Sequence, residues 1–328
     1  MIRITSPQSG DTVQIQSSVQ QQFLDSDRTR VKNATSYAWL SLEFKTQRDR
    51  SLGAGLAVTW EPRLEATLEV SESEDLSSPL TACGEGEAFA VNLKLGTRYY
   101  LRVRTESEVS DVITVTTADR APRFLTVEGA TNVRDCGGWN TKDGRRVRPG
   151  LLFRGSEIGG KINATEAGLA TMRQVLGIRA ILDLRGPTAQ PKDPLGVDYY
   201  RNVPFSAYHN GIYILPVMRD VFEFLADRRH YPMYFHCMGG ADRTGTVAFL
   251  VNALLGVSET DLADDFELTT LSLFGVRSRN SQSYLGLLSA IAAYDGETLS
   301  EKVEDYLLAA GVTGEEIATI REIFLEEA

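Results

Sequence analysis

The sequence predicts a multidomain protein, in which an N-terminal all-β sandwich precedes a C-terminal α/β domain with a mainly parallel central sheet flanked by helices. Two observations lead to this fold class. Apolar and polar side chains alternate with a period of two in the first part of the chain, whereas short apolar runs alternate with segments of helical spacing in the second. The 328 residues are also enough for about two domains of ordinary size. We expect a β domain over residues 1–118 and an α/β domain over residues 119–328.

The strands expected in the β domain are short and separated by turns. Apolar residues alternate at Tyr99, Leu101 and Val103, and a turn sequence precedes them at residues 95–97. Several short strands at such spacing are typical of a β-sandwich. The region resembles the later strands of fibronectin type III domains through Trp60 and through Leu93-x-x-Gly96-Thr97-x-Tyr99-x-x-x-Val103. Residues 1–50 fit that pattern poorly, and an unrelated β-sandwich is the alternative.

A linker and a change in the spacing of apolar residues mark the start of the α/β domain. Residues 116–123, TTADRAPR, have the composition of a linker. Beyond them, residues 164–177 have helical spacing and end in a glycine, and residues 178–184 form an apolar run typical of a buried strand. The alternation continues with a helix over 214–229, a short strand over 233–236, an apolar helix over 244–255, and amphipathic helices near 283–294, 298–310 and 313–326. Strands that alternate with helices imply a mainly parallel sheet covered on both faces.

The composition excludes several classes of protein. A net charge of −10 argues against a general nucleic-acid binder and against a polybasic membrane binder. No run of about 20 apolar residues predicts an integral membrane span. The N-terminus lacks the apolar core of a signal peptide, which predicts a cytoplasmic protein if this is the full gene product, or a secreted one if a signal has been removed. We expect no cofactor, and neither a disulfide framework nor a metal site is predicted by the spacing of Cys83, Cys136, Cys237, His209, His230 and His236.

The segment FHCMGGADRTG, residues 235–245, carries the strongest chemical signal. Cys237 ends a predicted strand and Arg243 begins a predicted helix, and ligands of α/β folds lie at the carboxyl ends of strands. Gly239 and Gly240 allow the intervening loop to turn its N–H groups toward one point, where they and the helix dipole favour an anion and a thiolate. The Arg243 guanidinium can hold two phosphate oxygens. Rhodanese-like sulfur transfer also uses a Cys in an amide loop, but Arg-Thr-Gly at this spacing favours phosphate.

This arrangement predicts phosphoryl transfer in two steps. The Cys237 thiolate attacks phosphorus, a cysteinyl-phosphate forms, and water hydrolyses it. Asp242 is the nearest candidate for the general acid that protonates the leaving group. His236 is expected to orient the loop by hydrogen bonding. We expect the phosphate-binding loop to consist of Met238, Gly239, Gly240, Ala241 and Thr244, with the Thr244 hydroxyl also donating to the sulfur.

Residues 123–328 resemble the cysteine-dependent protein tyrosine phosphatase superfamily, and within it the bacterial branch whose loop reads His-Cys-x-x-Gly-Lys-Asp-Arg-Thr-Gly. The other matching segments are residues 132–138, 143–158, 181–185 and 306–321. The resemblance implies that Cys237 is the nucleophile, Arg243 the phosphate clamp and Asp242 the general acid. The branch includes tyrosine and dual-specificity phosphatases, some of which act on phosphoinositides.

The sequence departs from that branch at two positions. Ala241 stands where the relatives often have Lys, which removes a cation expected beside the phosphate. A multiply phosphorylated head group calls for extra positive charge, so this departure speaks against phosphoinositide activity. Gly155 replaces a Ser of the upstream motif, although Ser156 is adjacent.

Four charged residues outside the loop are expected to support it. Arg134, Asp135 and Arg154 either line the pocket or form an ion-paired hairpin packed on the core. Asp183, at a strand end, is either a second catalytic carboxylate or a hydrogen-bonding partner of the loop. Residues 204–210 contain no Asp, although many family members carry a mobile acid loop there, and this favours Asp242 as the acid.

Three functions are compatible with these residues. The first is a phosphatase that hydrolyses phosphotyrosine, with phosphoserine and phosphothreonine as further substrates. The second is a phosphoinositide or inositol-phosphate phosphatase that uses the same loop. The third is a phospho-ligand binding module without turnover, against which the intact Cys237, Asp242 and Arg243 argue. The expected partner is a phosphorylated protein or a small phosphomonoester, and the β domain is the candidate surface for a protein partner.

Overall fold

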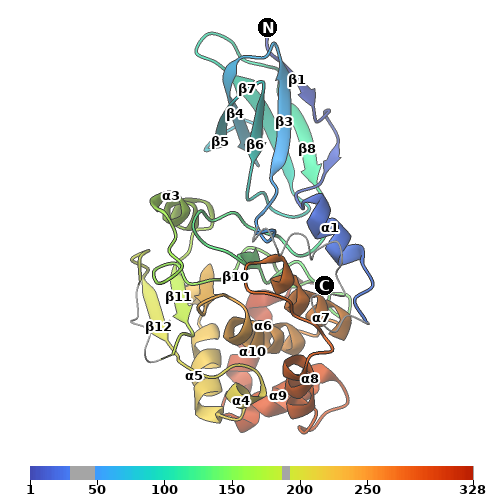
Figure 1. Ribbon diagram of the computed structural model, residues 1–328, viewed down its shortest axis with the longest axis vertical. Coiled ribbons are helices and arrows are strands. Elements are labelled where there is room, and N and C mark those ends of the chain that lie inside the picture. Colours follow the sequence, from blue (N-terminus) through green and yellow to red (C-terminus); the bar gives the residue numbers. More distant parts are fainter. Residues whose placement is uncertain (30–48, 187–192, 328) are drawn as a thin grey trace.

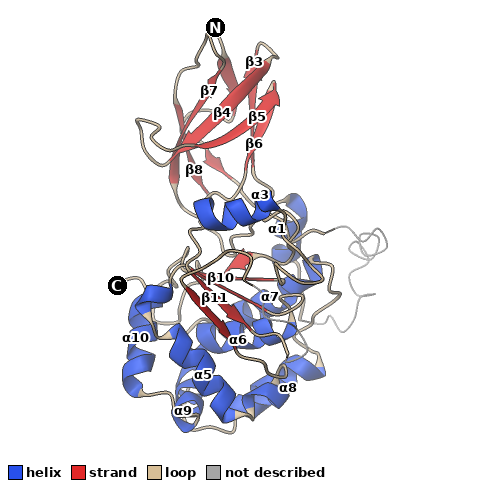
Figure 2. Ribbon diagram, turned by 90° about the vertical axis from the view of Figure 1, so that its left-hand side faces the viewer, coloured by secondary structure: helices blue, strands red, loops and turns tan. Residues whose placement is uncertain are grey.

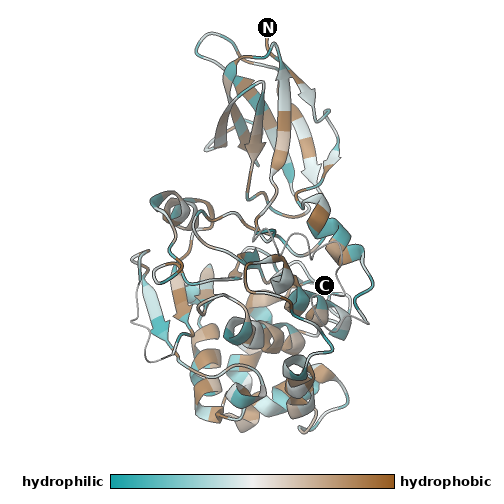
Figure 3. Cartoon of the chain, viewed as in Figure 1, coloured by the Kyte–Doolittle hydropathy of each residue, from teal (hydrophilic) through white to brown (hydrophobic). Residues whose placement is uncertain are grey.

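The structure is a computed structural model that describes residues 1–29, 49–186 and 193–327, and it consists of two parts stacked along the long axis of the molecule (Figure 1). Strands from the first 118 residues form the upper part in that view, and the lower part contains another sheet surrounded by helices. Hydrophobic residues recur along the upper strands and along the lower helices (Figure 3). The buried ones form separate clusters in the two parts, so each part has a core of its own.

Two sheets make up the upper part. The first has the order β1-β3-β6 and is antiparallel, with β1 at Arg3–Ser6, β3 at Leu56–Glu61 and β6 at Glu87–Ala90. The second has the order β2-β8-β7-β4-β5, with β2 at Thr12–Val13, β8 at Ile113–Thr117, β7 at Arg98–Arg104, β4 at Glu65–Ser71 and β5 at Leu80–Glu85. Tyr99, Leu101 and Val103 of β7 are buried and alternate with more exposed neighbours, as a strand with one buried face requires. Both sheets contribute to one apolar cluster.

Helix α1 (Ser18–Asp25) departs from the all-β prediction for this region. Ser17 begins it with a capping box, and its buried Phe23 packs in the core of the lower part instead of between the sheets. Further along, Arg28 forms an ion pair with Asp264 at 2.5 Å. The N–H of Arg50 donates to the Leu271 carbonyl at 2.8 Å. Although these residues precede position 118, their contacts join them to the α/β part.

The central sheet of the lower part has the order β12-β11-β13-β10-β9. Four strands are parallel, namely β12 (Tyr199–Asn202), β11 (Ala180–Asp183), β13 (Met233–His236) and β10 (Leu152–Gly155), and β9 (Arg134–Asp135) is antiparallel to β10. Every residue of β10, β11 and β13 is buried, as expected for strands covered on both faces. The prediction of an α/β part with a mainly parallel sheet is confirmed.

Helices cover both faces of the central sheet (Figure 2). On one face, Ile181 and Tyr234 share a cluster with α3 (Glu166–Ala170) and the π-helical turn Thr171–Val175. On the other, Leu182 and Phe235 join the larger cluster. The remaining helices of the described residues are α4 (His209–Ile212), α5 (Leu215–Leu225), α6 (Asp242–Leu254), α7 (Glu259–Glu267), α8 (Gln282–Ile291), α9 (Leu299–Ala309) and α10 (Gly314–Phe324), with 3₁₀ turns at Arg228–His230 and Leu268–Leu271. Within the described ranges, none of the helices has the length and apolar character needed to cross a membrane.

Candidate active site

The Cys237 loop, residues 237–241, connects the carboxyl end of β13 to the first turn of α6. Strand β13 is the middle strand of the central sheet, and α6 is buried continuously from Thr244 to Leu254. A helix that is buried on all sides is held by the core around it. The loop therefore lies between two rigid elements, at the edge of the sheet where ligands of α/β proteins bind.

The outer side of the Cys237 loop is held through its carbonyl groups. Asn132 Nδ2 donates to the carbonyls of Gly239 at 3.2 Å and Gly240 at 3.0 Å. Arg154 Nη2 donates to the same Gly240 carbonyl at 2.9 Å. Across the described chain, no acceptor is found for the N–H groups of residues 238–241. Neighbouring N–H groups left free on one loop at a helix N-terminus form a site for an anion.

Close packing behind the loop restricts two positions to glycine. Gly240 has a φ of +64°, and a Cβ there would lie 2.3 Å from the carbonyl carbon of Gly155. A Cβ on Gly155 would in turn lie 2.3 Å from the hydroxyl oxygen of Tyr234. That hydroxyl donates to the Ser156 carbonyl at 2.6 Å. Tyr234 thus fills the space that a serine at position 155 would need, which accounts for the departure from the related motif.

Cys237, His236 and Thr244 are buried. The Cys237 side chain is 4% exposed, and the Thr244 hydroxyl and His236 Nε2 have no hydrogen-bonding partner among the described residues. An unsatisfied buried hydroxyl costs about 1–3 kcal/mol, so Thr244 is suited to donate to a thiolate or to a bound oxyanion. His236 Nδ1 lies 3.2 Å from the Cys237 carbonyl oxygen, and burial lowers the pKa of His236 although the Asp183 carboxylate opposes this. A neutral imidazole fits an orienting role.

Arg243 extends from the first turn of α6 toward the end of β11. Its Nη1 donates to the Leu184 carbonyl at 3.1 Å, and the side chain is partly exposed. No other hydrogen bond or ion pair of this guanidinium is found within residues 1–29, 49–186 and 193–327. Its remaining N–H groups can therefore bind oxygens of an anion at the Cys237 loop.

Asp242, the first residue of α6, is held by two residues from distant segments. The Tyr208 hydroxyl donates to Asp242 Oδ1, and Arg277 contacts the same oxygen through Nε at 3.0 Å and Nη2 at 2.8 Å. Burial and the adjacent Asp242 charge raise the pKa of Tyr208, so its hydroxyl remains a donor. Sequence reasoning did not single out Tyr208 or Arg277, because neither belongs to a motif with recognisable spacing.

Arg134 and Arg154 lie behind the loop and not in an open pocket. Both are buried and both bind Asp265, Arg134 through Nε at 2.7 Å and Arg154 through Nη1 at 2.5 Å. Burial alone would raise the pKa of Asp265, but the two guanidinium charges hold it below its usual value. The sequence left open whether these arginines line the pocket or form ion pairs packed on the core, and the geometry corresponds to the second alternative. Asp265 was not predicted, because it lies more than one hundred residues from both arginines.

The two supporting carboxylates are also held in structural contacts. Asp135 accepts from the N–H groups of Gly137 at 2.9 Å and Gly150 at 2.6 Å, and burial raises its pKa. Asp183 accepts from Arg185 Nη2 at 2.6 Å and from the Tyr200 hydroxyl at 2.7 Å. Burial would raise the pKa of Asp183, but these donors hold it below its usual value. The geometry thus favours the hydrogen-bonding role for Asp183 over the acid role.

The polar groups at the Cys237 loop are mainly donors. They comprise the free N–H groups of the loop, the Arg243 guanidinium and the Thr244 hydroxyl, and together they suit an oxyanion beside a thiol. Nowhere in the described ranges do three His, Cys, Asp or Glu side chains gather as a metal site would require. The arrangement can therefore bind a phosphate-like group within reach of a sulfur nucleophile.

The sequence of this chain matches the model of one protein family. The model of the family described as the tyrosine phosphatase family matches residues 125–326, which is more than half of the chain. The curated "Putative tyrosine-protein phosphatase" of Cupriavidus necator is 28% identical over 184 residues, covering 45% of this chain and 66% of that protein, so slightly less than two thirds of the relative is spanned.

Two solved structures show a weaker likeness. The core catalytic domain of the PP-IP phosphatase Siw14 from S. cerevisiae, in complex with citrate, is 18% identical with a TM-score of 0.34, covering 47% of this chain and 86% of that one. The Siw14 catalytic core is 15% identical with a TM-score of 0.33, covering 47% and 85%. At these TM-scores the likeness carries no argument about the substrate.

Proposed function

This chain belongs to the tyrosine phosphatase family, a family of phosphoric monoester hydrolases, and on that premise we propose that it hydrolyses phosphotyrosine through a cysteinyl-phosphate on Cys237. Phosphoserine and phosphothreonine are further candidate substrates. The observation that carries the proposal is the Cys237 loop. Its carbonyls are bound by Asn132 and Arg154, while four successive N–H groups beside a buried thiol have no acceptor among the described residues. Donors fixed before the substrate arrives stabilise the charge of the transition state without reorganising.

In the first proposed step, Cys237 Sγ forms a bond to phosphorus while the bond from phosphorus to the ester oxygen breaks. The electron pair of that bond leaves with the ester oxygen, which takes a proton from Asp242. Arg243 and the loop N–H groups hold the equatorial oxygens. In the second step, water attacks phosphorus, its proton passes to Asp242, and the sulfur leaves as a thiolate that the Thr244 hydroxyl stabilises. The unsatisfied Thr244 hydroxyl supports this last role.

A phosphoinositide or inositol-phosphate substrate is the second candidate, and the charges near the loop favour it less. Ala241 provides no cation, and Arg134 and Arg154 are buried on Asp265. Arg277 is near the loop but is neutralised by Asp242. A singly phosphorylated tyrosine needs no further cation, whereas a polyphosphorylated ring does. The intact nucleophile, acid and clamp speak against a module that only binds.

We also propose that residues 1–118 include a fibronectin type III-like β-sandwich that offers a surface to a protein partner. Two sheets with a common apolar cluster support it. The Tyr99 hydroxyl accepts from the Lys94 N–H at 2.9 Å, five residues upstream, as in the tyrosine corner of such sandwiches. Burial raises the pKa of Tyr99 to about 12, so this hydroxyl stays protonated.

Phosphate release from a substrate panel tests the proposed function. The panel contains phosphotyrosine, phosphoserine and phosphothreonine peptides, phosphoinositides and inositol hexakisphosphate. We expect release from the phosphotyrosine peptides, and none from any substrate with Cys237→Ser, which should still bind the peptide. Cys83→Ser is the matched control, because Cys83 is exposed on β5. Equal release by wild type and Cys237→Ser would overturn the covalent mechanism.

A further inference from the structure

Asp242 is bound on one oxygen only. Its Oδ1 accepts from the Tyr208 hydroxyl and from two nitrogens of Arg277, whereas Oδ2 has no partner among the residues that the structure describes. A carboxylic acid carries its proton on one oxygen. With Oδ1 occupied by donors, the proton can reside only on Oδ2 without displacing a hydrogen bond.

Tyr208 is fixed to the first turn of α6. Its φ is +57°, an uncommon value for a residue with a bulky side chain. Its N–H donates to the Thr246 hydroxyl at 2.9 Å, and that hydroxyl donates to the Asp242 carbonyl at 2.9 Å. Local strain of this kind persists where the surroundings hold it, and it is often found at functional sites. The Tyr208 hydroxyl is therefore placed on Asp242 by the same helix turn that carries the carboxylate.

Arg277 is bound along both edges of its guanidinium. Nη1 donates to the carbonyls of Phe274 at 3.1 Å and Val276 at 3.3 Å, while Nε and Nη2 face Asp242. The Arg277 N–H also donates to the Thr270 hydroxyl at 2.9 Å. These contacts orient the guanidinium before any substrate arrives, which reduces the entropy lost in holding Asp242.

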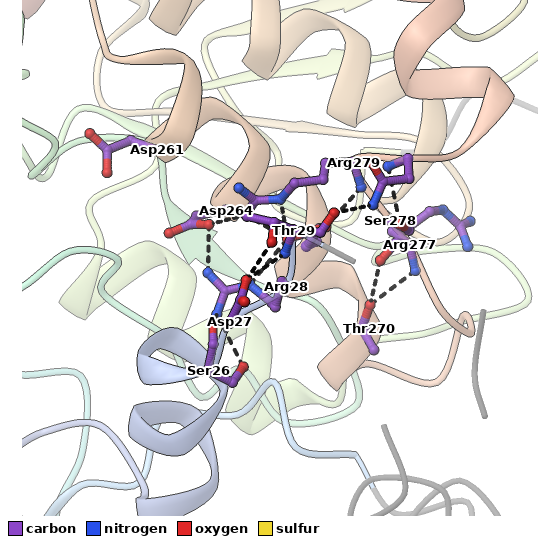
Figure 4. A network of polar contacts seen from close by, with 12 residues as sticks. Ser26, Asp27, Arg28, Thr29, Asp261, Asp264, Thr270, Arg277, Ser278 and Arg279 are labelled. Carbon is purple, nitrogen blue, oxygen red and sulfur yellow. Dashed lines mark hydrogen bonds and ion pairs between the residues drawn. The ribbon is translucent and has the colours of Figure 1, made fainter. Parts of the chain in front are cut away.

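A partly buried polar network anchors the segment that carries Arg277 (Figure 4). Arg279 binds the fully buried Glu267 through Nε at 3.1 Å and Nη2 at 2.7 Å, and it also binds Asp264. Arg28, from the segment after α1, binds the same two carboxylates, at 3.1 Å to Glu267 and 2.5 Å to Asp264. Asn280 Nδ2 further donates to the Thr29 carbonyl at 2.8 Å. The N-terminal segment thus helps to fix the backbone two residues from Arg277.

We infer that Arg277 is a positioning residue for Asp242, with Tyr208 as its partner and the network of Arg28, Asp264, Glu267 and Arg279 as its anchor. The inference rests on the proposed function. Arg277 and Tyr208 hold Oδ1 and leave Oδ2 to deliver the proton to the ester oxygen as the bond to phosphorus breaks.

The test is the dependence of kcat on the leaving group, measured with aryl phosphates from an activated nitrophenol to an unactivated phenol. We expect Arg277→Ala to lower kcat about 10²-fold for the poor leaving group, as loss of catalytic geometry does, with KM little changed. For the good leaving group, which needs little protonation, we expect kcat to fall by less than about threefold. Arg277→Lys should recover part of the loss, because its ammonium can still bind Oδ1.

Two comparisons make the result specific. Arg277→Ala combined with Asp242→Asn should be no slower on the poor leaving group than Asp242→Asn alone, since both changes remove one function. Arg228→Ala, which removes an exposed ion pair with Glu322 far from the loop, should leave the whole series unchanged. If Arg277→Ala does not fold, Tyr208→Phe takes its place, with the same pattern expected at smaller size.

Three results would overturn the inference while leaving the proposed function intact: an unchanged series, equal losses on all leaving groups, or a raised KM with unchanged kcat. The last would assign Arg277 to substrate binding. A wild-type protein that releases no phosphate from any aryl ester would instead overturn the proposed function, and this inference with it.

Discussion

Arg154 and Asp265 form a buried ion pair with 2.5 Å between Nη1 and Oδ2, and Nη2 of Arg154 donates to the Gly240 carbonyl. Asp265 binds Arg134 as well, so two buried cations share one carboxylate. Arg134 in turn donates to Asn132, which binds the same loop carbonyls. Asp265 therefore supports the Cys237 loop through Arg154, Arg134 and Asn132.

Replacement of Asp265 by Asn should destabilise the protein strongly. Arg134 and Arg154 would remain buried without their carboxylate, and such uncompensated charges cost about 3–5 kcal/mol of unfolding free energy. Urea unfolding at pH 7 measures this. Asp143→Asn is the control, because Asp143 forms an exposed ion pair with Arg145. This substitution should lower the unfolding free energy by less than about 1 kcal/mol. A small loss in Asp265→Asn would show that the loop does not depend on this carboxylate.

The same pair predicts a pH dependence. The pKa of Asp265 is lower in the folded than in the unfolded chain, so its contribution to stability is present above the unfolded value of about 3.9 and is lost as the pH falls through the folded value. The difference in unfolding free energy between wild type and Asp265→Asn should therefore narrow below about pH 4. A difference that widened on acidification would contradict the assignment.

Gly240→Ala should inactivate the protein more than it destabilises it. The new Cβ meets the backbone of Gly155, so the loop must shift and its N–H groups leave their positions, and a shift of about 1 Å can cost about 10²-fold in kcat. Gly144→Ala is the matched control, since Gly144 has a φ of +87° with no atom within 4 Å of its Cβ. Gly144→Ala should lower the unfolding free energy by about 1–2 kcal/mol through backbone strain alone and leave kcat unchanged. Equal kcat in the two variants would refute the packing argument.

The strand, the Cys237 loop and helix α6 could be predicted from the sequence because their signals are local. Residues 233–236 and 244–255 carry their own apolar patterns, and the observed elements agree within two residues at their ends. The loop glycines lie between them, so the position of Cys237 relative to Arg243 follows from a single stretch of chain. This part of the site could be predicted because its residues are close together in the sequence.

The contacts that hold the site could not be predicted, because their partners are far apart in the chain. Arg28 meets Glu267 across 239 residues, and Tyr208 meets Asp242 across 34. Helix α1 has only two buried side chains, Gln20 and Phe23, so it has no long apolar face that a period of 3.6 would reveal. Its partner surface is also in another part of the molecule. A single sequence contains no signal for such pairings.

Asp242→Asn tests the identity of the acid. We expect its turnover to fall by about 10²–10⁴-fold on an unactivated phenyl ester and much less on an activated one, because only the first needs a proton. Asp183→Asn is the comparison, and it should not change the leaving-group dependence, because Asp183 is held by Arg185 and Tyr200. If Asp242→Asn lowered turnover equally for all leaving groups, the general acid would be another residue.

Ala241→Lys tests whether the absent cation sets the choice of substrate. Ala241 is the N-cap residue of α6 and only 5% exposed, so a Lys there must extend along the loop to bring its ammonium to solvent. A second phosphate on a neighbouring ring carbon would gain a charge-assisted hydrogen bond worth about 1.5–3 kcal/mol, or one to two decades in kcat/KM. A phosphotyrosine peptide has no second phosphate and should change little. Ala318→Lys on α10 adds the same charge at an exposed position and should alter neither substrate class.

The wild-type preference decides how the Ala241→Lys result is interpreted. We expect wild type to favour phosphotyrosine peptides over phosphoinositides, and the variant to narrow that preference. A wild type that already favours phosphoinositides would require another cation at the loop. Arg134 and Arg154 are buried on Asp265, whereas Arg277 is partly exposed, so among these three arginines Arg277 is the candidate to leave Asp242 and bind the second phosphate. Arg277→Ala would then raise KM for phosphoinositides alone, a pattern that kinetics on both substrate classes separates from a loss of acid positioning.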